Sequence, residues 1–140
     1  MAVRAYLFAL AMFSVLLAGC SGDVDRVPAK GRVLIDGQPL AHGTIQVMPA
    51  GARPASGTIV NGEYVLETYG DGDGTLPGRH PVTISAIERV DADHIKWHAP
   101  KKYASQGSGL EVEVNPDGTA SDIQLSWDGG KPFVVSMKAD

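Results

Sequence analysis

Apolar and polar residues alternate with a period of two through most of the chain after Lys30, and this pattern restricts the fold more than any other feature of the sequence. Successive side chains of a β-strand point to opposite faces of the sheet, so this alternation predicts strands with one buried and one exposed face. Turn-forming glycines and prolines separate the alternating runs. No long stretch carries the period of 3.6 residues that an amphipathic helix requires. The sequence therefore predicts an all-β domain.

The strongest local signal is Asn61-Gly62, which lies between two alternating runs. Both residues tolerate positive φ, so the pair predicts a type I′ hairpin turn that places Val60 opposite Glu63. Ile59 and Tyr64 are then expected on the buried face. In all, seven strands are expected, within GRVLID, GTIQVMP, SGTIV, EYVLETY, HPVTISAIERV, LEVEV and DIQLSW. Such a set predicts a seven-stranded antiparallel Greek-key β-sandwich.

The start of the chain has the organisation of an export signal. A basic start that includes Arg4 precedes an apolar run, residues 5–18, that is too short to span a bilayer as a stable helix. Leu17-Ala18-Gly19, directly before Cys20, resembles the lipobox of bacterial lipoprotein signal peptides. The resemblance implies that residues 1–19 form a lipoprotein signal peptide, here expected as a helix, and that Cys20 becomes the acylated first residue, with palmitate among its chains. The alternative is an ordinary secretory signal followed by a buried cysteine.

An anchor with several acyl chains holds a protein firmly at a membrane, so the expected location is the cell envelope. In the lipoprotein class, Ser21 rather than aspartate after the cysteine implies the outer membrane. Residues 20–29 are expected to form a lipidated tether and residues 30–128 the β-sandwich. Residues 129–140 are left open as a tail or an edge strand.

Removal of the signal leaves about 120 residues, which is enough for one hydrophobic core. The 16 acidic residues outnumber the 12 basic ones, and Arg4 belongs to the signal, so neither nucleic acid nor anionic lipid head groups are expected as partners. Because Cys20 is the only cysteine, no internal disulfide can form. The expected partners are the membrane, through Cys20, and an envelope protein or glycan.

The run from Gly31 to Trp127 resembles the carboxypeptidase-regulatory-like domain, which has a transthyretin-like (prealbumin-like) fold and occurs in small bacterial envelope lipoproteins. The matching segments are GRVLIDGQPLAHGTIQVMP, RPASGTIVNGEYVLET, GDGTLPGRHPVTIS and APKKYASQGSGLEVEVNPDGTASDIQL. The resemblance implies a seven-stranded sandwich in a family whose members mostly have no demonstrated activity.

The segment from Asp91 to Gly109 is long for a connection within a compact sandwich. Its bulky residues, including Trp97 and Tyr103, are expected to lie back against the domain, with Tyr103 closing one open end. The same two aromatic residues are candidate ligand contacts, because exposed rings in loops can stack on sugars.

Two groups of candidate metal ligands are weak. His94 and His98 would face the same way on a helical turn, but two nitrogens do not complete a zinc site and no local spacing brings in other histidines. Asp71 and Asp73 lie in a glycine-rich loop that lacks the ligand positions of an EF-hand, so a turn is expected there. No metal or other cofactor is expected.

No catalytic constellation is predicted. Cys20 is expected to be acylated, so its thiol is not available as a nucleophile, and no G-x-S-x-G elbow is present. The hydroxyisourate hydrolases share the transthyretin fold, but they end in Tyr-Arg-Gly-Ser, whereas this chain ends in FVVSMKAD. Adhesin modules that form isopeptide bonds use a lysine in the first strand, where this chain has Leu34 and Ile35.

The sequence therefore favours a non-catalytic envelope lipoprotein with a binding or structural role. A carbohydrate-binding or ligand-binding module that uses loop aromatics is the alternative. A hydrolase of unknown class ranks third, and its mark would be a pocket in which at least two of His42, His80, His94 and His98 converge.

Overall fold

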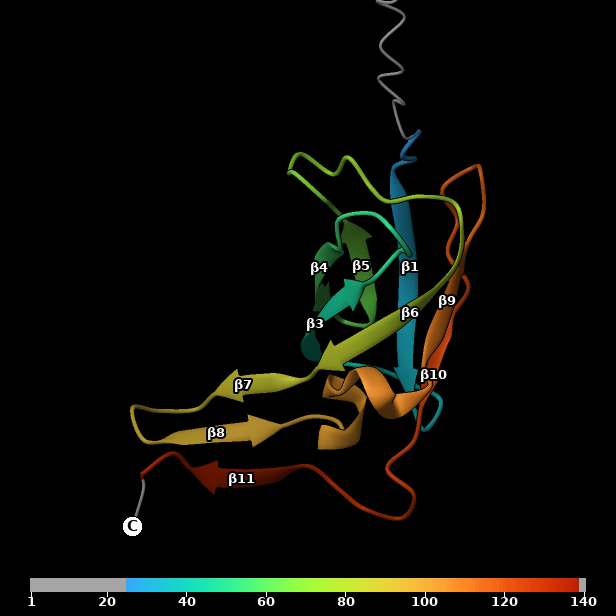
Figure 1. Cartoon of the computed structure of the whole chain (residues 1–140). Helices are drawn as coiled ribbons and strands as arrows, with labels where there is room; N and C mark the ends of the chain where they lie inside the picture. Colours follow the sequence, from blue (N-terminus) through green and yellow to red (C-terminus); the bar gives the residue numbers. More distant parts are fainter. Residues whose placement is uncertain (1–24, 139–140) are drawn as a thin grey trace, which may run out of the picture.

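The computed structural model describes residues 25–138, and it confirms the all-β class, with 49% of the residues in strands and 6% in helices (Figure 1). The strands are β1 (Ala29–Ile35), β2 (Gln38–Pro39), β3 (His42–Val47), β4 (Ala55–Val60), β5 (Glu63–Leu66), β6 (Gly78–Ser85), β7 (Ile87–Arg89), β8 (His94–Trp97), β9 (Glu111–Val114), β10 (Ile123–Leu125) and β11 (Phe133–Ser136). Two short 3-10 helices, η1 (Lys101–Ala104) and η2 (Gln106–Ser108), lie between β8 and β9.

The larger sheet is a curled half-barrel with the strand order β10-β1-β5-β4-β3-β6-β9, and β2 pairs with β1 at its side. Neighbouring strands are antiparallel except β1 and β10, which are parallel, with Val33 opposite Ile123. The expectation of a purely antiparallel arrangement is therefore wrong for this pair. The seven-stranded Greek-key sandwich is not confirmed, because these strands form one continuous curled sheet and three further strands form a separate small sheet.

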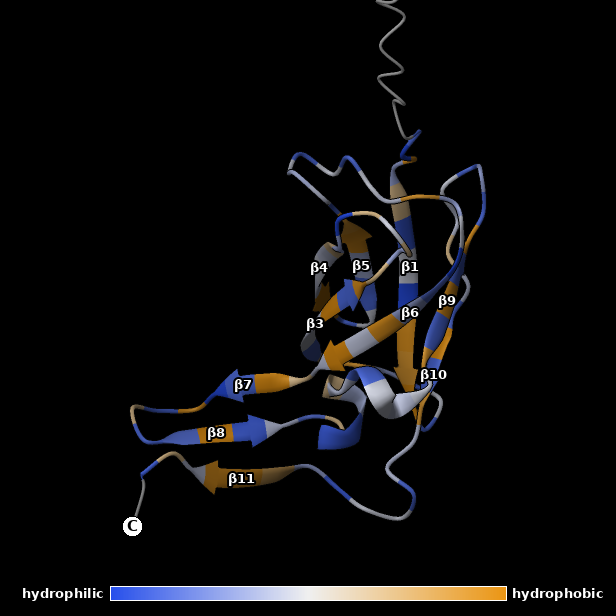
Figure 2. Ribbon diagram, viewed as in Figure 1, coloured by the Kyte–Doolittle hydropathy of each residue, from blue (hydrophilic) through white to orange (hydrophobic). Residues whose placement is uncertain are grey.

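The hydrophobic core fills the inside of the curl. Alternate residues of the strands point into it, and Val33, Ile45, Ile59, Leu66 and Ile84 are completely buried. Burial of each such side chain contributes about 1.5 to 3 kcal/mol to the free energy of unfolding. Figure 2 shows the alternation of apolar and polar residues along β9, where Val112 and Val114 are buried and Glu111 and Glu113 are exposed. The period-two pattern of the sequence therefore specifies which face of each strand is buried.

Two hairpin turns have positive φ at both central residues, and the geometry of the one at Asn61-Gly62 was predicted. Asn61 and Gly62 have φ of 50° and 80°, and Val60 pairs with Glu63, as expected for a type I′ turn. Asp36-Gly37 between β1 and β2 also has positive φ at both residues. A side chain at Gly62 would be blocked, since its Cβ would lie 2.8 Å from Pro39 Cβ.

The segment from Asp91 to Gly109 is more ordered than a loop. It contains β8, η1 and η2, and because β8 starts at His94, the helical turn considered as a way to align His94 and His98 is not formed. β8 lies between β7 and β11 in a small antiparallel sheet, which we call the arm. The arm projects from one end of the half-barrel (Figure 1). The C-terminal region therefore provides an edge strand, β11, through residues 133–136.

The ordered part of the fold begins earlier than expected. Val27 pairs with Thr75, and Ala29 is buried in the core, so the folded domain includes residues of the segment 20–29 that was expected to form the tether. Cys20 and the predicted signal peptide, residues 1–19, lie outside the described residues. Between residues 25 and 138 there is no helix with the length and hydropathy of a membrane span.

Candidate functional site

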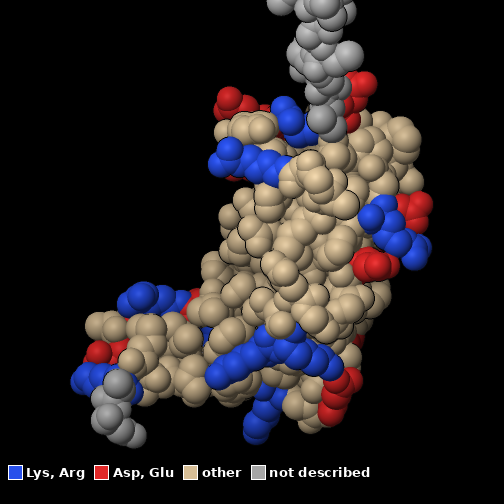
Figure 3. All heavy atoms as spheres, in the orientation of Figure 1, with Lys and Arg blue, Asp and Glu red and all other residues tan. Residues whose placement is uncertain are grey.

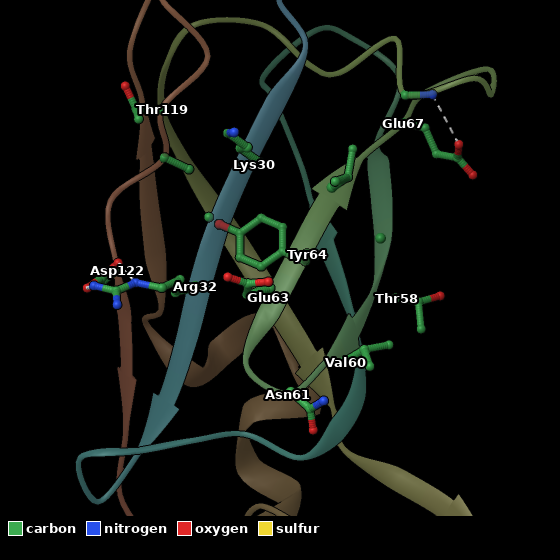
Figure 4. A pocket seen from close by; sticks show the side chains of 15 residues that line it. Lys30, Arg32, Thr58, Val60, Asn61, Glu63, Tyr64, Glu67, Thr119 and Asp122 are labelled. Carbon is green, nitrogen blue, oxygen red and sulfur yellow. Dashed lines mark hydrogen bonds and ion pairs between the residues drawn. The ribbon is translucent and has the colours of Figure 1, made fainter.

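An open groove of about 850 Å³ lies over β1, β5 and β4 (Figure 4). Its sides come from segments far apart in the sequence, because residues 119–122, which lead into β10, run alongside β1. Thr58 and Val60 of β4 lie on one side of β5, and Lys30 and Arg32 of β1 lie on the other (Figure 4). The groove therefore depends on the sheet topology, and no single continuous segment of the sequence contains its lining residues.

An ion pair forms one wall of the groove. Arg32 donates from Nη2 to Asp122 Oδ2 at 2.7 Å and from Nε to Asp122 Oδ1 at 3.2 Å. This two-pronged contact joins β1 to the segment before β10, and it raises the pKa of Arg32 above its ordinary value. Both side chains are exposed, so the pair positions the wall and contributes little to stability.

The floor of the groove combines apolar and charged groups. Val60 and Val65 are 58% and 56% exposed, although aliphatic side chains of this size are usually buried. Acidic Glu63 on β5 and Glu67 directly after β5 also line the groove, and basic Lys30 lies on β1. A surface with exposed methyl groups and charges of both signs is suited to a ligand with apolar and hydrogen-bonding faces.

Tyr64 lies beneath the groove, with its ring directed toward β1 (Figure 4). Its hydroxyl is buried and has no hydrogen-bond partner among residues 25–138. Desolvation, followed by the negative charge of Asp122, raises the pKa of Tyr64 to about 12. A Cβ at Gly31 would lie only 2.5 Å from this hydroxyl oxygen, so the glycine makes room for the ring. The phenol is therefore a neutral proton donor and is poorly suited to act as a base.

The two aromatic residues proposed as ligand contacts lie elsewhere. Trp97 and Tyr103 are only 9% and 8% exposed, and Tyr103 packs in the core, as expected for a residue that closes one end. The Tyr103 hydroxyl donates to Ser126 O at 3.2 Å and accepts from Ser126 N at 3.0 Å. A sugar stacks on one accessible ring face, and two side chains that are less than a tenth exposed offer little of such a face, so the structure gives no support to their use as stacking platforms.

Three of the four histidines have hydrogen-bond partners that are separate from one another. His94 Nδ1 lies 2.9 Å from Asp91 Oδ1, and the buried His80 contacts the Leu76 carbonyl. His98 Nε2 lies 2.6 Å from Glu88 Oε2 and holds the pKa of Glu88 below its usual value, with its ring 6.4 Å from that of His42.

His42 and His98 therefore approach each other, but neither lines the groove over β1, β5 and β4. Within residues 25–138, no three His, Cys, Asp or Glu side chains are arranged to hold a metal ion. The convergence of histidines in a pocket, which would indicate a hydrolase, is therefore not seen in the groove.

The aspartates of the glycine-rich loop support its turn. Asp73 accepts backbone hydrogen bonds from Thr68 N at 2.7 Å and from Tyr69 N, and these bonds lower its pKa. Asp71 has a φ of 57°, which fits a turn position. The carboxylate of Asp73 is thus occupied by the loop itself, in agreement with the predicted turn.

Sequence reasoning missed the groove and the exposed Tyr69. The exposure of Val60 and Val65 follows from the alternation, but only the neighbouring strands show that the two residues line a groove.

Searches with the chain found no matching family model, no curated protein and no solved structure with significant similarity.

Proposed function

We propose that this protein is a non-catalytic, lipid-anchored module of the bacterial cell envelope that binds a ligand in the groove over β1, β5 and β4. The observation that carries the binding role is the groove itself, which exposes Val60 and Val65 between side chains of both charges. The anchoring role rests on the lipobox-like Leu17-Ala18-Gly19-Cys20 and on Ser21, which favours the outer membrane.

The family assignment is part of the proposal. We place the chain with the carboxypeptidase-regulatory-like domains and interpret its curled sheet as a Greek-key sandwich of two layers, β10-β1-β5 and β4-β3-β6-β9. In support, β4 and β5 pair regularly only at Val60 and Glu63, with one further bridge between Ser56 and Glu67. The sheet is thus weakest where the two layers would meet, and the core residues lie between them.

The lining of the groove favours an uncharged or mixed-charge envelope polymer, such as a glycan or a peptide-bearing glycan. Hydroxyl and amide groups of Thr58, Asn61 and Thr119 offer hydrogen bonds, while Val60 and Val65 offer an apolar strip. A strongly anionic or cationic ligand is less suited, because Glu63 and Glu67 oppose the basic residues of β1. This ligand class replaces the loop aromatics as the basis for the carbohydrate-binding alternative.

The test is a glycan array and a peptidoglycan pull-down with the purified full chain and two valine variants. Val65→Arg places a long cation in the groove and is expected to reduce binding at least about tenfold. Val134→Arg is the matched control, since Val134 is 53% exposed on the arm. Equal binding by wild type and Val65→Arg, or loss of binding in Val134→Arg alone, would contradict the role of the groove.

A further inference from the structure

A second cavity, of about 250 Å³, lies at the end of the half-barrel where the described chain begins. Its lining includes Arg26, Arg53, Tyr69 and Thr75, which come from the chain start and from the loops that follow β3 and β5. Figure 3 shows both basic and acidic side chains at the end of the domain where the described chain begins. The cavity is smaller than the usual pocket for a drug-sized ligand, so it suits a single small functional group.

Two guanidinium groups lie over the ring of Tyr69. Arg26 Cζ is 4.7 Å and Arg53 Cζ is 5.1 Å from the ring centroid. Tyr69 is itself 66% exposed, so these contacts fix the two arginines beside the cavity without burying them in the core.

The charges at this cavity do not cancel. Arg26 Nε lies 3.4 Å from Asp73 Oδ2, and Asp73 also accepts backbone hydrogen bonds. None of the ion pairs among residues 25–138 involves Arg53. Arg53 is therefore a cation in the cavity lining that no ion pair among the described residues neutralises, and it favours an anion locally although the chain as a whole is acidic.

Thr75 supplies an independent indication of a ligand. Its side chain is 1% exposed, and its hydroxyl has no hydrogen-bond partner within the described part of the chain. Two reciprocal backbone hydrogen bonds fix Thr75 to Val27: Val27 N donates to Thr75 O at 2.9 Å, and Thr75 N donates to Val27 O at 3.1 Å. A buried, fixed hydroxyl without a partner is costly unless something bonds to it.

We propose that this cavity binds a phosphate group. Guanidinium groups match phosphate oxygens with paired hydrogen bonds, and a threonine hydroxyl adds a further donor. The source is either a phospholipid head group or a soluble phosphate ester. The head-group source rests on the proposed anchoring, because an extended chain from Cys20 to Arg26 spans about 20 Å, which keeps the cavity close to the membrane.

The test uses the full chain purified in neutral maltoside micelles without phosphate. Inorganic phosphate, glycerol 3-phosphate and phosphatidylglycerol are added separately, and the Tm of unfolding is followed, with sodium chloride of equal ionic strength as reference. Saturating ligand is expected to raise Tm by at least about 3 °C. Arg53→Gln is expected to weaken binding at least about tenfold, whereas Arg89→Gln, an exposed arginine on the arm, is expected to bind as wild type.

The outcomes separate the two sources. A response to phosphatidylglycerol alone assigns the site to a head group, and a response to inorganic phosphate or glycerol 3-phosphate assigns it to a soluble phosphate. No response beyond that to sodium chloride, or an equal response in Arg53→Gln, overturns the proposal. Mass analysis of Cys20 in the same sample reports separately on the anchor, so failure of the phosphate site and failure of the anchoring are distinguishable.

Discussion

Tyr64 shows how a single residue can be well packed and poorly satisfied at once. Its ring fills the space left by Gly31, yet its hydroxyl is buried without a partner among the described residues. An unsatisfied buried hydroxyl costs about 1 to 3 kcal/mol. Burial of the Tyr64 ring therefore stabilises the fold, whereas burial of its hydroxyl oxygen destabilises it.

Tyr64→Phe is predicted to leave the free energy of unfolding unchanged at pH 8 or to raise it by about 1 kcal/mol. Denaturant titration of the full chain measures this value. A loss of more than about 1 kcal/mol would show that the hydroxyl has a stabilising partner.

The same variant has a predicted pH dependence. The folded pKa of about 12 exceeds the ordinary value of 10.0, so the folded state holds the phenolic proton more tightly than the unfolded state. The stabilisation that this tighter proton binding gives the folded state is fully present below about pH 10 and is lost as the pH rises toward 12. Wild type is expected to lose about 2 to 3 kcal/mol more than Tyr64→Phe over this range. Parallel loss in both proteins would contradict the raised pKa.

At the scale of elements, the arm is held together by aromatic contacts. Phe133 of β11 stacks on Trp97 of β8 with ring centroids 6.4 Å apart, and Trp127 meets Phe133 edge-on at 6.3 Å. The ammonium group of Lys101 lies 5.4 Å from the Trp97 ring centroid. These contacts belong to the arm and its connections, so the arm can loosen while the half-barrel stays intact.

Phe133→Ala is predicted to speed hydrogen exchange at the amides of β8 by about 5-fold to 30-fold and to leave those of β3 unchanged, because the lost aromatic contact is worth about 1 to 2 kcal/mol. Amide exchange followed by NMR measures both strands in one experiment. Val134→Ala, on the opposite face of β11, is the control and is expected to have little effect. Equal acceleration in β3 and β8 would show that the arm and the half-barrel unfold together.

The elements also show what the sequence could and could not predict. Asn61-Gly62 and the alternation around it specify a hairpin locally, and the structure has that hairpin. His94 and His98 are four apart, a spacing that places two side chains on one face of either a helix or a strand, so the spacing alone did not identify β8. The parallel pairing of β1 with β10 and the groove depend on contacts between distant segments, which no local pattern contains.

At the scale of the whole molecule, the two ends of the domain have different surroundings in the proposed arrangement. Val27 is held to Thr75 at one end, and the arm projects from the other (Figure 1). If Cys20 carries the lipid, the short chain between Cys20 and Val27 keeps the first end near the bilayer. The arm is then at the end far from the bilayer, and the groove opens at the side of the half-barrel (Figure 1).

Cys20→Ala is predicted to shift the protein from the membrane fraction to the soluble fraction, or to leave it unprocessed, because the acyl chains supply most of the membrane affinity. Fractionation followed by intact mass measurement tests this. Ser21→Ala, beside the acceptor thiol, is the control and is expected to stay lipidated. A Cys20→Ala protein that remains with membranes as a mature product would contradict the anchor.

The parallel pair of β1 and β10 has a consequence for how the chain folds. Arg32 and Asp122, which join these strands at the groove, are 90 residues apart in the sequence. Closing so long a loop costs conformational entropy before any contact is gained, so folding of this topology is expected to be slow. Nearly the whole domain must leave the ribosome, or cross a translocation channel, before its first strand can acquire both neighbours.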